Sequence, residues 1–185
     1  MEERVTAGSA AEATVTRRGE ASEGVKISGH YIAECVGSDG QVKWRDEIKN
    51  LVTTVGKNDL LDKYLGNAAA GLIYMGLKGV GAADTADTQG SHATWLEQGL
   101  ANAPTYTGNR PTPSFAAAAA GSKATSAAVS FAITSGGTVA GVFINIGGSA
   151  TKDNTTGILF SAGDFSGSRV VVGGDTINVT YTASA

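Results

Sequence analysis

The stretch that decides the fold is "TINVTYTA", residues 176–183 of the 185-residue chain. Its apolar side chains Ile177, Val179 and Tyr181 alternate with threonine and asparagine side chains. Because successive side chains of a β-strand point to opposite faces, this alternation predicts a strand with one buried face and one wet face. Strands of this kind are typical of antiparallel sheets.

The same alternation appears in "KATSAAVSFAIT", residues 123–134, and the apolar run "TVAGVFINI", residues 138–146, follows it. Gly-Gly pairs separate such runs and indicate tight turns. About eight short runs predict an all-β fold, an antiparallel β-sandwich or jelly roll. Within residues 122–183 we expect antiparallel strands with these side chains buried: Val129, Phe131, Ile133, Val142, Ile144, Ile177, Val179 and Tyr181.

The middle of the chain adds more strands to this sandwich. "HYIAECV" and "QVKWR" flank Ser38-Asp39-Gly40, and an Asp-Gly turn between strand-like runs predicts a β-hairpin. "GLIYMGLK", residues 71–78, reads as a buried strand. Residues 79–93 are expected to form a polar loop, and residues 95–113 an irregular crossing between sheets.

One segment predicts a helix, "IKNLVTTVGKNDLLDKYLGN", residues 48–67. It begins with β-branched and apolar residues up to Val55 and continues at helical spacing after Asn58, the expected N-cap, until Gly66. We expect Leu61 and Leu65 to face the core and this short helix to plug one open end or edge of the sheets. The side chains expected to stay exposed are Lys57, Asp62 and Lys63.

Residues 1–27 show neither helical nor strand periodicity, so we divide the chain into an extended N-terminal arm, 1–27, and a β-sandwich domain, 28–185. The formal net charge of −3 gives no electrostatic footprint for nucleic acid or an anionic membrane. No apolar run is long enough for a membrane span, and no secretory signal is visible. The only cysteine, Cys35, is expected to be a small buried apolar residue.

The sequence offers few candidates for catalysis, metal binding or cofactor binding. Ser91 and His92 are adjacent, but a nucleophile and its base must converge in space, so we interpret His92 as a loop or packing residue. Asp84 and Asp87 lack the remaining oxygen ligands of a calcium loop. "KGVGAAD", residues 78–84, is an incomplete dinucleotide fingerprint. We therefore expect no enzyme activity and no catalytic, cofactor or metal site.

A carbohydrate-binding module is a further alternative. It would need exposed aromatic side chains beside loop carboxylates or amides. Trp95 with Glu97 and Tyr106 is the candidate group for such a site.

Several segments resemble a family of small virion proteins of tailed bacteriophages. They are "GSDGQVKWRDEIKNLVTTVGKNDLLDKYL", "SHATWLEQ", "NRP" and "TTGILFSAGDFSGSRVVVGGDTINVTYTASA", in this order between residues 30 and 185. Members of this family are described as head decoration, cement or tail fibre proteins. The resemblance implies a structural protein of the virion.

A compact β-domain with an arm fits a capsid decoration (cement) protein better than a fibre, because no heptads or shaft repeats are present. We therefore expect a protein made in the host bacterial cytoplasm that binds the major capsid protein lattice on the capsid surface and stabilises the head. We also expect a homo-oligomer, a dimer or a trimer. The alternative is a tail or tail-fibre structural component with a host-binding β-sandwich.

Overall fold

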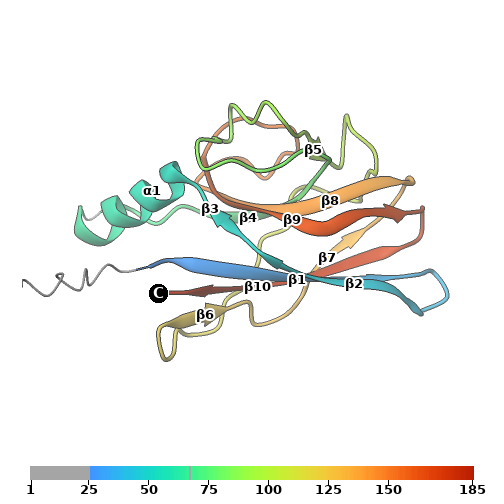
Figure 1. The fold of residues 1–185 in the computed structure, drawn as a ribbon, viewed down its shortest axis with the longest axis horizontal. Coiled ribbons are helices and arrows are strands. Elements are labelled where there is room, and N and C mark those ends of the chain that lie inside the picture. Colours follow the sequence, from blue (N-terminus) through green and yellow to red (C-terminus); the bar gives the residue numbers. More distant parts are fainter. Residues whose placement is uncertain (1–25, 67) are drawn as a thin grey trace, which may run out of the picture.

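The computed structural model describes residues 26–66 and 68–185, and these residues form two antiparallel sheets and one short helix (Figure 1). The predicted all-β, antiparallel fold class with a short helix is thereby confirmed. The narrower assignment as a jelly roll stays a prediction. Within the described part of the chain, no helix has the length and apolar character needed to cross a membrane.

The first sheet, sheet A, has the strand order β2-β1-β10-β6, and β7 also pairs with β10. Its strands are β1 Ser28–Val36, β2 Val42–Lys49, β6 Ser122–Ala124, β7 Val129–Ala132 and β10 Thr176–Ser184. The second sheet, sheet B, has the order β3-β9-β8-β4-β5. Its strands are β3 Leu51–Val52, β4 Ile73–Lys78, β5 Glu97–Gln98, β8 Gly137–Ile146 and β9 Ile158–Val171. The helix α1 spans Thr54–Leu65.

The predicted hairpin is confirmed as β1 and β2, which pair antiparallel with Cys35 opposite Trp44. Gly40 occupies a left-handed conformation with φ of 78°, which a glycine adopts without steric cost. The buried strand predicted at residues 71–78 is present as β4. The segment that follows β5 carries the chain from sheet B to sheet A, as expected for residues 95–113.

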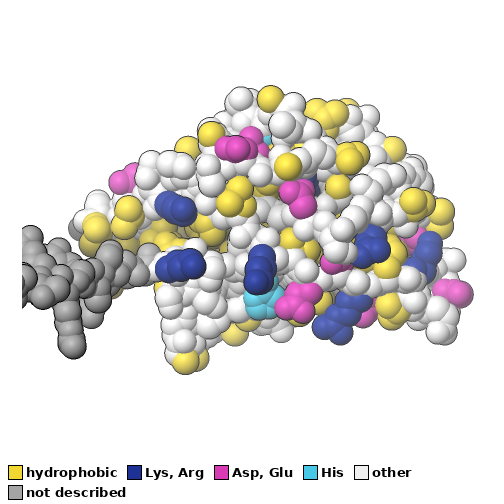
Figure 2. All heavy atoms as spheres, viewed as in Figure 1, with side chains coloured by type: hydrophobic (Ala, Val, Ile, Leu, Met, Phe, Trp, Pro, Cys, Tyr) yellow, Lys and Arg dark blue, Asp and Glu magenta, His cyan; other side chains and the backbone are white. Residues whose placement is uncertain are grey.

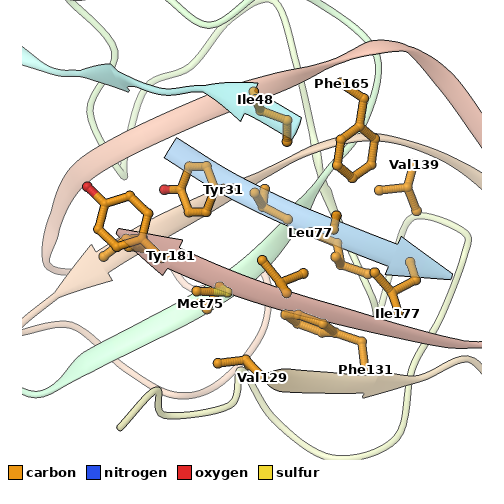
Figure 3. Packing of buried hydrophobic residues seen from close by; sticks show 14 of the residues in the cluster. Tyr31, Ile48, Met75, Leu77, Val129, Phe131, Val139, Phe165, Ile177 and Tyr181 are labelled. Carbon is orange, nitrogen blue, oxygen red and sulfur yellow. The ribbon is translucent and has the colours of Figure 1, made fainter. Parts of the chain in front are cut away.

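The main core lies between the two sheets (Figure 3). Tyr31 of β1 and Ile177 of β10 meet Met75 and Leu77 of β4 there. Burying side chains from the inner faces of both sheets is the principal stabilising contribution in a sandwich. All eight side chains predicted to be buried are buried: Val129, Phe131, Ile133, Val142, Ile144, Ile177, Val179 and Tyr181.

The strands were predicted to have one buried face and one solvent-exposed face, and sheet B differs from this prediction. Strand β8 is buried on both sides, because Phe143 points away from the main core into a second apolar cluster with Trp95 and Leu159. Loop residues that follow β4, including Ala83 and Trp95, cover this outer face (Figure 1). Residues 79–93, expected to be a polar loop, thus form part of a third layer.

The helix begins earlier than predicted. Thr53, not Asn58, is the N-cap: its hydroxyl accepts a hydrogen bond from the Gly56 N–H at 3.0 Å. The β-branched and apolar run from Ile48 to Val55 is divided between elements: Ile48 belongs to β2, whereas Val55 already belongs to α1. A buried N-cap that also donates to the Leu159 carbonyl outweighs the local β-propensity of Val55.

The expected orientation of the helix is wrong. Leu61 and Leu65 are 51% and 75% exposed, and only Leu60 packs against the core. Helix α1 lies beyond the end of the sheets, so these side chains have no core to enter (Figure 1). Lys57 and Asp62 are exposed as predicted, whereas Lys63 is partly buried in an ion pair with Asp59.

The N-terminal arm predicted at residues 1–27 falls almost entirely outside the described residues. Of its last two residues, Lys26 is exposed and Ile27 packs partly against the main core. Strand β1 begins directly afterwards at Ser28.

Candidate functional site

The residues that the sequence analysis considered for catalysis or metal binding, His92, Asp84 and Asp87, make packing contacts and hydrogen bonds within the fold. The His92 ring stacks on Trp95 with 3.8 Å between ring centroids, and its Nδ1 lies 2.8 Å from the Trp95 carbonyl oxygen. This agrees with a packing role for His92. Asp87 accepts hydrogen bonds from Trp95 Nε1 at 2.8 Å and from the Asp84 N–H at 3.0 Å. Among residues 26–66 and 68–185, no three His, Cys, Asp or Glu side chains are grouped as metal ligands.

The candidate sugar-binding group is buried. Trp95, Glu97 and Tyr106 are all less than 5% exposed, so they cannot present an aromatic surface to a carbohydrate. The Glu97 carboxylate instead forms a bidentate pair with Arg110, at 2.8 Å and 2.5 Å. This pair fixes the loop layer over sheet B.

Lys152 and Tyr106 lie beside that pair. Lys152 Nζ donates to the Tyr106 carbonyl at 2.7 Å, and it sits 4.2 Å from the centroid of the Tyr106 ring. Burial lowers the pKa of Lys152, although Glu97 and Asp153 act in the opposite direction. Burial raises the pKa of Tyr106 far above its ordinary value, and Glu97 adds to the rise. Lys152 is thus held by a hydrogen bond, whereas the Tyr106 hydroxyl is buried by packing and has no hydrogen-bond partner among the described residues.

Cys35 is buried in sheet A, as predicted. Burial, together with the nearby Asp175 carboxylate, raises the pKa of its thiol to about 11. A thiol with a raised pKa is a poor nucleophile at neutral pH. Cys35 therefore acts as a packing residue.

The described surface has an apolar hollow at the α1 end of the sandwich. Two cavities, of about 660 Å³ and about 860 Å³, adjoin along α1, and both are lined by Leu60 and Tyr64. We call them together the α1 trough. The first cavity is lined mainly by Leu60, Ile73, Phe115, Ile146, Phe160 and Ala183. The second is lined mainly by Ile27, Leu60, Leu61, Tyr64, Leu65 and Ala185.

The helix forms a wall of the α1 trough because only part of it is packed: Gly56 in its first turn is buried, and Leu60 packs against the main core. Gly56 is its only buried residue and approaches the Phe160 carbonyl of β9. A Cβ at position 56 would lie 2.9 Å from the Phe160 Cα, so glycine permits this contact. The later turns carry apolar residues at positions 60, 61, 64 and 65, a spacing that places them on one helix face.

That apolar face is exposed to solvent. Tyr64 is 84% exposed, and Leu72, on the segment after the helix, is also largely exposed. Figure 2 shows hydrophobic side chains gathered at this end of the molecule with lysine or arginine side chains beside them. Contiguous exposed apolar surface with a polar rim is typical of a binding surface.

The sequence analysis missed this surface. The helical spacing of Leu60, Leu61, Tyr64 and Leu65 was visible, but an amphipathic stripe does not tell whether its own chain covers it. The assignment of Leu61 and Leu65 to the core assumed a helix lying on a sheet face. The helix lies instead at the sheet ends, where the stripe faces the α1 trough.

Comparison of the chain with protein-family models, with curated proteins and with solved structures gave no match.

Proposed function

We propose that this protein is a structural protein of a bacteriophage virion, a capsid decoration (cement) protein that binds the major capsid protein lattice and stabilises the head. The resemblance to small virion proteins rests on segments within residues 30–185. These include the turn before β2, β2 itself, the α1 segment and the strands β9 and β10. The proposal is that these elements form an assembly module without catalytic activity.

The observation that carries the proposal is the exposed apolar α1 trough. Leu61, Tyr64 and Leu65 cover no core of their own chain in the described part of the molecule. Apolar surface of this kind is stabilised when another protein chain removes it from water. A role in assembly with other subunits therefore suits this surface.

The outer face of sheet A supplies a second kind of surface. On β10, Thr176, Asn178, Thr180 and Thr182 alternate with the core residues and are partly exposed. Ser130 of β7 donates to Asn178 Oδ1 at 2.6 Å on this face. Uncharged hydroxyl and amide groups suit many weak contacts with a repeated lattice. Modest affinity at each site is then sufficient, because the contacts act together through multivalency.

Stabilisation of the head follows from mass action. A protein that binds the assembled shell but not its free subunits shifts the equilibrium towards the shell. Particles that lack the protein should therefore lose their genome at a lower temperature or under milder osmotic shock.

The number of copies in each particle tests the proposal against a tail location. Quantitative mass spectrometry of purified particles, with cryo-electron microscopy of the same particles, gives both number and position. A decoration protein should be present in hundreds of copies over the head. About a dozen copies or fewer at one vertex would place the protein on the tail and disprove the cement role.

A further inference from the structure

The chemistry of the α1 trough defines what can cover it. Its walls are apolar, while its lining includes the side chains of four lysines and one acidic residue: Lys26, Lys57, Lys63, Lys123 and Asp59. Lys63 pairs with Asp59 at 2.7 Å, so the other lysines leave the rim positive. A segment that combines small apolar side chains with acidic ones is complementary to this surface.

The chain itself contains such a segment, and it begins at the mouth of the α1 trough. Lys26 and Ile27 line the second cavity, and residues 1–25 precede them. Those residues include five glutamates, three arginines and several valines and alanines. Their acidic excess is opposite in sign to the charge of the rim.

We propose that two copies of this chain join with their α1 ends facing, and that residues 1–25 of each copy lie in the α1 trough of the other. This inference rests on the proposed function and names a partner for the surface that carries it. A two-fold arrangement repeats every contact and closes as a dimer. It covers the exposed face of both helices.

The direction of β1 favours a second copy as the partner. Strand β1 enters the sandwich from the α1 end, so the chain before Lys26 starts at that end of the molecule (Figure 1). A facing copy lies ahead of it. Length sets no limit, because 25 extended residues span about 80 Å and α1 is about 18 Å long.

The first experiment measures the mass of the full-length protein by light scattering after size-exclusion chromatography, over a dilution series. The wild type should be a dimer at micromolar concentration. The double variant Leu61→Asp with Tyr64→Asp should weaken the dimer by about 100-fold or more, because two carboxylates would enter an apolar contact. Both side chains are exposed, so the fold should be retained. Val170→Asp, at an exposed position near the far end of β9, is the matched control and should stay dimeric.

The second experiment tests whether residues 1–25 are the occupant. Glu20→Lys with Glu23→Lys should weaken the dimer, and adding Lys57→Glu with Lys123→Glu should restore it. Trypsin should cleave after Arg17 and Arg18 slowly in the wild-type dimer and at least about tenfold faster in the Leu61→Asp, Tyr64→Asp variant.

Several results would overturn the inference. They are a monomeric wild type, a dimer that survives the helix variant, and a charge reversal without effect or rescue. Protection from trypsin in a monomer would place residues 1–25 in their own α1 trough and equally overturn it. These measurements use the purified protein, so their failure is distinct from a low copy number in the virion, which tests the proposed function.

Discussion

Lys78 and Asp164 form an ion pair across the backbone of Gly141 in sheet B. Gly141 pairs with Lys78 on one side and with Asp164 on the other, and it has no side chain to separate them. Lys78 is fully buried and also donates to the carbonyl oxygens of Gly79 and Gly81. The pair therefore joins β4 to β9 without a direct strand contact.

Asp164→Ala should lower the free energy of unfolding by about 1–3 kcal/mol, because it leaves a buried ammonium with fewer partners. The Asp164 carboxylate is 39% exposed, so the loss should be smaller than for a fully buried pair. Adding Lys78→Met should recover part of the loss, since no charge then remains buried. Urea denaturation checks this, with Asp62→Ala on the exposed side of α1 as the control. If the double variant were less stable than Asp164→Ala alone, the explanation would be contradicted.

Phe131→Ala should cost about 3–5 kcal/mol through lost burial and a cavity. Phe131 is buried and packs edge-on against Tyr106, with 5.0 Å between ring centroids. The neighbouring Ser130→Ala on the exposed face should change stability by about 1 kcal/mol or less. A loss below about 1 kcal/mol for Phe131→Ala in a denaturant melt would show that the inward face of β7 contributes little to the core.

Gly56→Ala should destabilise the protein, although alanine is favoured over glycine by about 1 kcal/mol in an exposed helix. The added Cβ would collide with the Phe160 backbone, so α1 would have to move off β9 at a net cost of about 1–3 kcal/mol. Asn58→Ala, at an exposed helical position, is the control and should be neutral or slightly stabilising. Thermal and urea unfolding of both variants measure the difference. An unchanged or raised stability for Gly56→Ala would show that the contact is loose.

Acid should weaken the protein through Asp46. Burial favours the protonated carboxyl, but hydrogen bonds from Arg169 and Ser166 outweigh it and hold the pKa of Asp46 below its ordinary value. In the unfolded chain the Asp46 carboxyl has a pKa of about 3.9, so in acid the unfolded chain binds more protons than the folded chain. The stabilisation is complete above about pH 5 and is lost as pH falls through the folded pKa.

Asp46→Asn should therefore be less stable than the wild type at neutral pH, and its stability should fall less steeply below about pH 5. Asp175 has a lowered pKa from its pair with Lys43, so part of the acid dependence should remain in the variant. Urea melts at a series of pH values measure the slopes. Parallel curves for variant and wild type would exclude Asp46 as a source of the acid dependence.

The sequence correctly predicted those parts of the fold that local patterns determine, such as which side chains of a single strand face the core. Alternation on β10 and β7 identified Phe131, Ile177 and Tyr181 as core, because strand geometry alone sorts those side chains. The Asp39-Gly40 turn gave the β1–β2 hairpin for the same local reason.

What the sequence did not predict depends on contacts between distant segments. The N-cap at Thr53 follows from a hydrogen bond to Leu159, far along the chain. The burial of Phe143 on the outer face of β8 requires Trp95 from a loop. The exposure of Leu61 and Leu65 depends on where α1 sits relative to the sheet ends, which no local pattern encodes.

The two-sided burial of β8 sets an order of opening for the native protein. Its backbone amides pair with β4 and β9, and apolar clusters cover both faces of the strand. Amides in such a position exchange with solvent deuterium only when most of the structure opens, whereas those in α1, of which only part is packed, exchange through local fluctuations. Exchange at β8 should therefore report the global free energy of unfolding, and exchange at α1 the freedom of one end of the molecule.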